Sequence, residues 1–135
     1  MKAVDTNILA RFFINDPDDS EAIRQQKMAL SIMSQPVFVS LTVILEFEWV
    51  MRGFYKLTRL EILTVFRALL GLLHVTIEEK ALVIGVLAKY EGGMDFADAL
   101  HVAKAQHCQA FVTFDQKLAN KANQYQDHVE IELLK

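Results

Sequence analysis

Two aspartates lie three residues apart in the segment M-D-F-A-D-A-L-H-V-A-K-A at residues 94–105. Phe96 and Leu100 follow helical spacing, so Asp95 and Asp98 are predicted on the first turn of a helix. Carboxylates this close repel each other, and one of them tends to keep its proton unless a cation neutralises them. No Lys or Arg lies three or four residues from either aspartate. The alternative is that both acids only stabilise a helix N-terminus, at roughly 0.3–1 kcal/mol each.

Two further aspartates follow predicted strands. Asp5 comes directly after the segment Lys2–Val4, and Asp115 comes shortly after Ala110–Thr113. Parallel strands in open α/β sheets place their ligands at the carboxyl ends of the strands, which share one edge. Either aspartate, or Thr6 or Asn7 beside Asp5, can instead serve only as a helix cap.

A fifth acid, Glu46, lies in an almost wholly apolar helix predicted over Ser40–Phe54. It has no cation within one helical turn, and a carboxylate on an apolar face is costly unless it is paired or binds a metal. Glu48 has Arg52 four residues later, which predicts an ordinary helix ion pair. Since the two glutamates are about 200° apart on a helix, only one can face a common site. We therefore select Glu46.

These acids together predict a site for divalent cations. Carboxylate oxygens are the ligands that Mg²⁺ and Mn²⁺ prefer, and metals held in this way activate water and stabilise charge on a phosphodiester. Thr6, Asn7 and Thr113 are expected to orient ligands or water. The sequence contains no His/Cys spacing for zinc, no Ser/His/Asp arrangement and no Gly-rich phosphate loop.

Three cations, Arg52, Lys56 and Arg59, surround Phe54 and Tyr55. Cations interleaved with aromatic rings suit a phosphate backbone with stacked bases. A solvated connector with two partly buried aromatics is an equally good interpretation.

Strand-like and helical segments alternate along the chain, which predicts a parallel sheet wrapped by helices. The expected strands are 2–4, 37–39, 74–76, 110–113 and 130–133. The expected helices cover 8–14, 21–33 with Ser20 as its cap, 40–54, 58–70, 78–90, a segment from about 95, and a short one from 116.

The composition predicts one domain of 135 residues with a rich core, since 53% of the residues are hydrophobic. No apolar run is long enough to span a membrane, and no secretory signal is evident. The single cysteine, Cys108, fits a reducing cytoplasm and is expected to be a buried small hydrophobe. A net charge of −3 is unlike that of a non-specific nucleic-acid coat.

The segments V-D-T-N at 4–7, D-F-A-D-A-L-H at 95–101 and V-T-F-D at 112–115, with Glu46 in a helix, resemble the PIN-domain ribonucleases. More narrowly, they resemble the VapC toxins of type II toxin–antitoxin systems. The resemblance covers essentially the whole chain in order. It implies a three-layer α/β/α PIN-like domain over residues 1–135, with a central parallel sheet of four to five strands.

The resemblance also implies a metal-dependent endoribonuclease that cleaves structured RNA such as tRNA or rRNA. Its catalytic metal ligands would be Asp5, Glu46, Asp98 and Asp115, holding one or two Mg²⁺ or Mn²⁺ ions, with Thr113 beside them and Asp95 as an auxiliary acid. Its partners would be an antitoxin that inserts a basic residue into the acidic site and a second copy in a homodimer. His101 is expected to be packed.

Two alternatives belong to other classes of protein. A phosphoacceptor receiver domain is also small, acidic and α/β, but it needs a Lys at a late strand end, and Thr113–Asp115 offers none. A non-catalytic PIN-like interaction module would keep the core and lose acids, whereas every expected acid is present.

Overall fold

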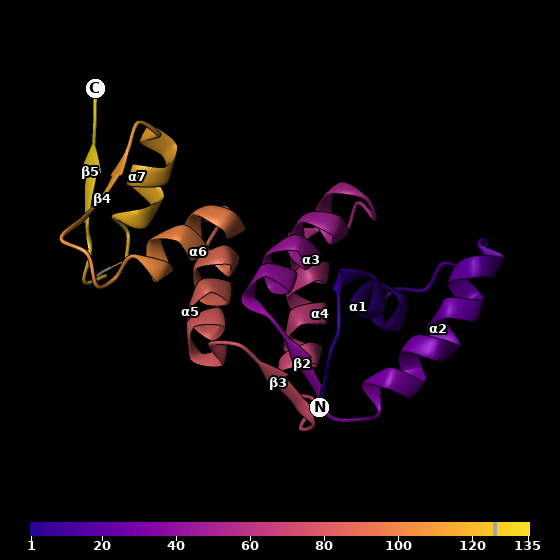
Figure 1. The fold of residues 1–135 in the computed structure, drawn as a ribbon. Coiled ribbons are helices and arrows are strands. Elements are labelled where there is room, and N and C mark those ends of the chain that lie inside the picture. Colours follow the sequence, from indigo (N-terminus) through magenta and orange to yellow (C-terminus); the bar gives the residue numbers. More distant parts are fainter. Residues whose placement is uncertain (126) are drawn as a thin grey trace. The chain divides into compact units, whose positions relative to one another are not determined.

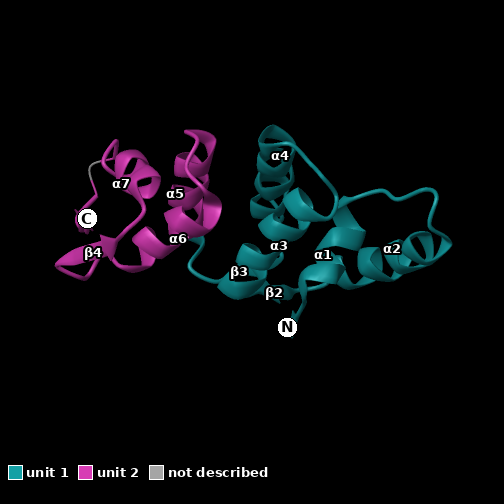
Figure 2. Ribbon diagram, turned by 90° about the horizontal axis from the view of Figure 1, so that it is seen from above, with its two compact units in different colours: residues 1–80 teal, residues 81–135 magenta. Residues whose placement is uncertain are grey.

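The structure, a computed structural model, describes residues 1–125 and 127–135. It divides into two compact units, residues 1–80 and residues 81–135, drawn in different colours in Figure 2. Helices and strands alternate in both units, and every strand pairing is parallel. The predicted α/β class with parallel sheets is confirmed, in agreement with a PIN-like α/β/α fold.

The first unit contains a three-stranded parallel sheet in the order β1-β2-β3. Strand β1 (Lys2–Ala3) pairs with β2 (Val37–Val39), which pairs in turn with β3 (Val75–Ile77). The helices of this unit are α1 (Thr6–Phe13), α2 (Ser20–Met33), α3 (Leu41–Gly53) and α4 (Arg59–Leu70). Helices α1 and α2 pack side by side, as Figure 1 shows.

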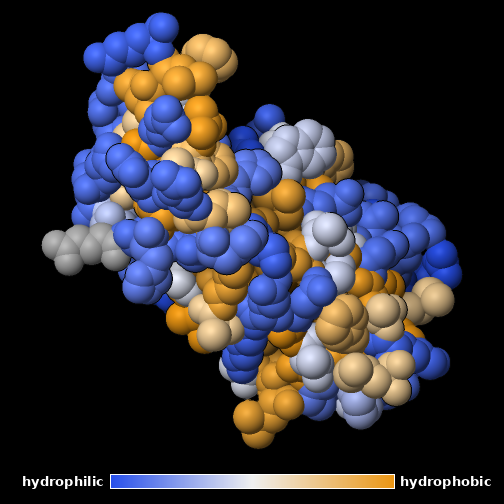
Figure 3. Space-filling view, turned by 60° about the vertical axis from the view of Figure 1, so that its left-hand side comes forward, coloured by the Kyte–Doolittle hydropathy of each residue, from blue (hydrophilic) through white to orange (hydrophobic). Residues whose placement is uncertain are grey.

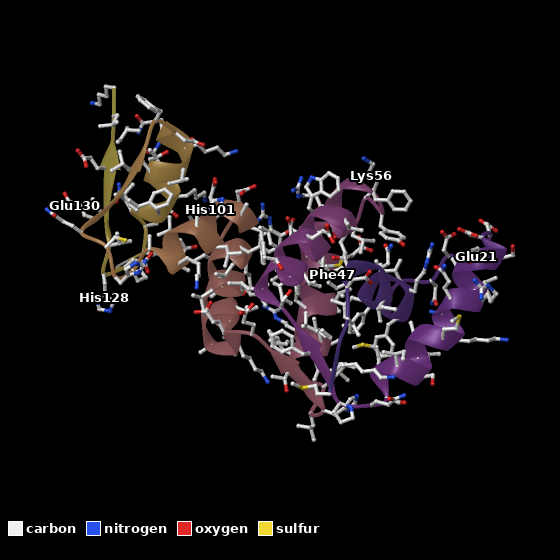
Figure 4. The ribbon with its side chains drawn as sticks, in the orientation of Figure 1. Glu21, Phe47, Lys56, His101, His128 and Glu130 are labelled. Carbon is white, nitrogen blue, oxygen red and sulfur yellow. The ribbon has the colours of Figure 1, made fainter. Side chains whose placement is uncertain are left out.

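The core of the first unit is centred on Phe47 of α3, which is fully buried and labelled in Figure 4. Its ring meets Phe66 of α4 edge-on, with centroids 5.8 Å apart, and lies 6.3 Å from Phe13 of α1. Three helices therefore contribute aromatic rings to one cluster, and this cluster fixes the helix that carries Glu46.

The second unit contains the helices α5 (Lys80–Glu91), α6 (Phe96–Lys104) and α7 (Gln116–Ala122). The first residue of α5, Lys80, is the last residue of the first unit. Strands β4 (Ala110–Thr113) and β5 (Glu130–Leu133) pair in parallel. The buried rings of Tyr90 and Phe96 meet edge-on at 5.5 Å, and this contact anchors the start of α6.

Several details differ from the predictions. Within the described residues, the first unit has a three-stranded sheet and the second a two-stranded one, so each sheet is smaller than the expected four to five strands. Helix α2 is capped by Asp19, whose carboxylate accepts from two backbone N–H groups, and Ser20 is already helical. Cys108 is exposed, so the prediction of a buried hydrophobe is wrong. Among the described residues, none of the helices has the length and apolar character needed to cross a membrane.

Candidate functional site

Asp5 is the N-cap of α1. Its Oδ1 atom accepts a hydrogen bond from the backbone N–H of Ile8 at 3.2 Å. Strand β1 ends two residues earlier, so the cap stands where the chain leaves the sheet. The side chain is exposed, and no hydrogen bond to its Oδ2 atom is found within the described residues. One oxygen thus holds the helix while the other is available to a ligand. The cap is Asp5, and not Thr6 or Asn7.

Thr6 and Glu46 are joined across the first unit. The Thr6 hydroxyl, on a residue that is 4% exposed, donates a hydrogen bond to Oε1 of Glu46. Glu46 itself is exposed on α3. A buried hydroxyl next in sequence to Asp5 therefore fixes the direction of a carboxylate on another helix. Asn7, also exposed, follows on the first turn of α1.

The physical reason given for selecting Glu46 was wrong, because Glu48 is the buried glutamate of α3. Glu48 is 3% exposed and accepts from Nε of Arg52 at 2.9 Å, so the predicted helix ion pair is confirmed. Helix α3 is less central than its composition indicated: Trp49, on the face away from the core, is 61% exposed. The apolar pattern was too uniform to identify the buried face.

In the second unit, Asp95 is the N-cap of α6. Its Oδ1 atom accepts from the backbone N–H of Asp98 at 3.0 Å. Asp98 is therefore on the first turn, as predicted, and it is half-buried. The pattern of Asp5 recurs here: one oxygen of Asp95 holds the helix, and no partner of its Oδ2 atom is found in the described part of the chain.

Asp98 carries the clearest electrostatic signature among the candidate acids. Its pKa is raised above the ordinary value, first by burial and then by the negative charges of Asp95 and Asp115. The charge of His101, one turn later on the same helix, acts in the opposite direction. His101 is exposed, so the expectation that it is packed is wrong (Figure 4). Three acids of this unit thus repel one another.

Asp115 is held by a short turn after β4. Its backbone N–H donates to Oγ1 of Thr113 at 2.9 Å, and its Oδ1 atom accepts from the N–H of Leu118 at 3.1 Å, which caps α7. Thr113 thus orients the backbone that presents Asp115. Because Asp115 also raises the pKa of Asp98, the two acids interact within one unit.

The donor set fits a hard divalent cation in its chemistry. All four candidate ligands are carboxylates, and the pKa of Asp98 is raised by burial and, after that, by the neighbouring charges of Asp95 and Asp115. Neither unit, within residues 1–125 and 127–135, gathers three or more His, Cys, Asp or Glu side chains into a group that could hold a metal ion. Each unit by itself supplies only part of the predicted ligand set.

The three cations predicted to bind RNA lie near the turn between α3 and α4. Arg52 is paired with Glu48, Lys56 occupies a left-handed conformation with φ 58° (Figure 4), and Arg59 opens α4. Phe54 is 71% exposed and meets the ring of Tyr55 edge-on at 4.9 Å. The Phe54 ring is therefore accessible, and Arg52 is engaged within its own helix.

One acid at this edge of the first sheet was missed. Glu78 directly follows β3, and its Oε1 atom accepts from the backbone N–H of Leu41 at 2.7 Å. Glu78 thus joins the end of β3 to the first residue of α3. Ser40 is the N-cap of the same helix. The sequence signal was available, since Glu78 follows a strand just as Asp5 does. Its bond to a helix N-terminus gives it a structural role.

Comparison with known proteins gives one match. The sequence model of the family described as PIN domain matches residues 2–124 of this chain. None of the curated proteins matches it. No solved structure matches it either.

Proposed function

Since the chain belongs to the PIN-domain family, we propose that it is a metal-dependent endoribonuclease and, within this family, a VapC-type toxin of a toxin–antitoxin pair. The observation that carries the proposal is the set of acids at the starts of α6 and α7, where burial, and then the negative charges of Asp95 and Asp115, raise the pKa of Asp98. A receiver domain is a different family, so that alternative falls away. We place both units in one nuclease domain over residues 1–135, because the family match continues without a break past residue 80.

The catalytic carboxylates in this proposal are Asp5 and Glu46 from the first unit and Asp98 and Asp115 from the second, and they would hold one or two Mg²⁺ or Mn²⁺ ions. A divalent cation bound by carboxylates activates water and stabilises negative charge on a phosphodiester. The Thr6 hydroxyl orients the Glu46 carboxylate by donating a hydrogen bond to it.

Thr113 performs the matching task in the second unit, because its Oγ1 atom fixes the backbone of Asp115. Asp95 is an auxiliary acid: it caps α6 and contributes negative charge next to Asp98. These side chains orient the ligands and do not themselves act as nucleophiles.

The test is cleavage of RNA by Asp→Asn variants. Asn caps helices as well as Asp does, so Asp5→Asn and Asp115→Asn remove a charge and keep their caps. We expect each to lose cleavage by roughly 10²–10³-fold, the typical effect of removing one group that stabilises transition-state charge. The matched control is Asp19→Asn, which makes the same change at the N-cap of α2.

The measurement is incubation of total RNA with purified protein and Mg²⁺ or Mn²⁺, followed by sequencing of the cleavage ends, with chelator as the metal-free arm. Site-specific ends that require metal and disappear in Asp5→Asn, but persist in Asp19→Asn, support the proposal and identify the RNA. Ends that persist in both variants contradict it. A structured tRNA or rRNA is the expected substrate.

The proposed antitoxin would insert a basic residue among these carboxylates. Arginine suits this role, because its planar fork pairs bidentately with a carboxylate. We expect both partners to act in the cytoplasm. The test is co-expression of this protein with the product of the neighbouring open reading frame. Co-purification and relief of growth arrest support the toxin assignment; their failure contradicts it and leaves the nuclease assignment intact.

The proposed homodimer is supported by exposed apolar side chains in and just after α4 and on α5, the two helices that we expect to carry the dimer surface. Leu60 in the first turn of α4 is 68% exposed, Leu73 shortly after the end of α4 is 101% exposed, and Ile84 of α5 is 52% exposed. Figure 3 shows hydrophobic residues, in orange, at the surface among hydrophilic ones, in blue. Light scattering of the purified protein tests this, and a monomer mass would contradict it.

A further inference from the structure

A pocket of about 260 Å³ lies against Asp5 in the first unit. One side is formed by α1, which contributes Asn7, Ile8 and Arg11, and the other by α2, which contributes Arg24, Gln25 and Met28. The volume is close to the lower end of small-ligand sites, roughly 300–1,000 Å³. It therefore suits a single chemical group of a larger substrate.

Arg11 is fixed in this pocket by its neighbours. Its Nε atom donates to Oε1 of Gln25 at 2.8 Å, and its Nη1 atom lies 3.5 Å from the hydroxyl of Tyr55. The residue is half-buried. Within the described residues no carboxylate pairs with it, and its Nη2 atom has no hydrogen-bond acceptor. The guanidinium thus keeps donors for a ligand and loses little freedom when it binds one.

Arg24 is a second cation on the opposite wall. It donates two hydrogen bonds to Glu21, at 2.6 and 3.1 Å, and both side chains are more than half exposed. Exposed pairs of this kind contribute little and exchange partners readily. The pKa of Glu21 (Figure 4) is lowered mainly by its bond to Arg24, and the charge of Arg11 acts in the same direction.

We propose that this pocket binds one phosphodiester group of the RNA substrate, with Arg11 as the main ligand and Arg24 as the second, beside the scissile bond at Asp5. The charged residues that line the pocket are two arginines and one carboxylate, and Glu21, which is not a lining residue, pairs with Arg24 at the exposed end of the wall. Guanidinium groups pair bidentately with phosphate oxygens. The inference rests on the proposed function, which places the cleaved bond at Asp5.

The pocket also has an apolar wall for the sugar or base next to that phosphate. Ile8 is half-buried, and Met28 is 57% exposed and flexible enough to adapt to a ring. A basic segment of a partner protein would instead meet Arg11 and Arg24 and be repelled. The two arginines therefore favour nucleic acid in this pocket, whereas the basic residue expected from an antitoxin would bind the proposed metal-ligand carboxylates.

The spacing of residues on α1 and α2 already indicated the two walls of this pocket. Asn7 and Ile8 stand four and three residues before Arg11, so the three share one face of α1. On α2, Arg24 and Gln25 stand four and three residues before Met28. Only the packing of α1 on α2 shows that these two faces meet.

The experiment measures binding of a labelled single-stranded RNA by fluorescence anisotropy, with chelator present and at several salt concentrations. We expect Arg11→Gln to weaken binding and to reduce the slope of log K against log salt by about 0.7, the value for one contact to a single-strand phosphate. Arg24→Gln is expected to have a smaller effect of the same sign. The matched control is Lys27→Gln, which removes an exposed cation of α2 outside the pocket.

Cleavage assays with metal provide a second measurement, in which Arg11→Gln raises KM and leaves kcat near that of wild type. Arg11→Lys keeps the charge without the fork, so it should restore most of the salt slope. Circular dichroism identifies a variant that fails to fold, and in that case the exposed Arg24→Gln decides the outcome.

The outcomes separate this inference from the proposed function. If Asp98→Asn abolishes cleavage while Arg11→Gln binds RNA no worse than Lys27→Gln, the subsite is overturned and the nuclease stands. If Arg11→Gln loses RNA binding but the wild type cleaves nothing, the subsite is supported and the nuclease assignment fails. If Arg11→Gln keeps RNA and releases a co-purified protein, the pocket serves that protein and the inference is overturned.

Discussion

The bond between Thr6 and Glu46 links the stability of the first unit to the proposed chemistry, and Thr6→Val tests both. Valine keeps the branched shape of threonine and removes only the hydroxyl. A hydrogen bond to a charged acceptor contributes about 1.5–3 kcal/mol to stability. Because Glu46 is exposed and water competes for it, we expect a contribution below that range, about 1 kcal/mol, from a bond whose donor is 4% exposed.

The free energy of unfolding, measured in urea, should therefore fall by about 1 kcal/mol in Thr6→Val. Thr64→Val is the matched control, because the Thr64 hydroxyl is exposed on α4 and bonds only locally, to the Leu60 carbonyl at 3.0 Å. Its change should stay within about 0.5 kcal/mol. If the bond also directs Glu46 during the reaction, cleavage by Thr6→Val should fall about fivefold, the rate equivalent of 1 kcal/mol.

A double-mutant cycle decides whether the effect belongs to this bond. Thr6→Val and Glu46→Ala should be non-additive, since either change alone removes the interaction. If the two changes add to within about 0.3 kcal/mol, or if Thr6→Val is no worse than Thr64→Val, the reasoning is refuted.

Two further predictions concern the helix that carries Asp98. The pKa of Asp98 is higher in the folded protein than in the unfolded chain, so the ionised carboxylate destabilises the fold above that pKa. At pH 7 and without metal, Asp98→Asn should therefore be more stable than wild type. This gain in stability should vanish as the pH falls toward the ordinary value of 3.8. Urea unfolding at pH 7 and pH 4 measures it, and an equal gain at both values would contradict the linkage. Gly93, just before α6, has φ 103°, so Gly93→Ala should cost about 1–3 kcal/mol of unfolding free energy, against no comparable loss for Gly85→Ala, whose added methyl group meets open space.

Much of the site could be predicted because its acids follow simple local rules. Asp5, Asp95 and Asp115 each stand at the start of a helix and accept the N–H three residues later, as the positions of their helices implied. The capping box of Thr58 and Glu61, with both of its bonds present, follows an equally local rule. Caps and strand ends depend on a few neighbouring residues, so the sequence alone determines them.

The burial and the partners of individual side chains could not be predicted, because they depend on which helix faces pack together. Glu46 and Glu48 lie on a helix that is apolar nearly all round, and only tertiary packing decides that Glu48 is buried against the core. Cys108 was assigned to the core from its residue type, yet it lies in the turn before β4 and is exposed. Arg11 has no local feature that marks it, because its partners come from α2 and from the end of α3.

The parallel pairing of the first unit has a consequence for how the protein is made. Strand β1 can pair only after Val37 of β2 has been synthesised, and β2 completes its pairing only after Val75 of β3 has followed. Almost the whole first unit must therefore leave the ribosome before its three-stranded sheet can form. The 35 residues from Ala81 to Asp115 follow, which takes about 2–7 s at 5–20 residues per second. During that interval the nascent chain holds Asp5 and Glu46 without their proposed partners. In the proposed function, the set of metal ligands therefore stays incomplete until Asp115 has been synthesised.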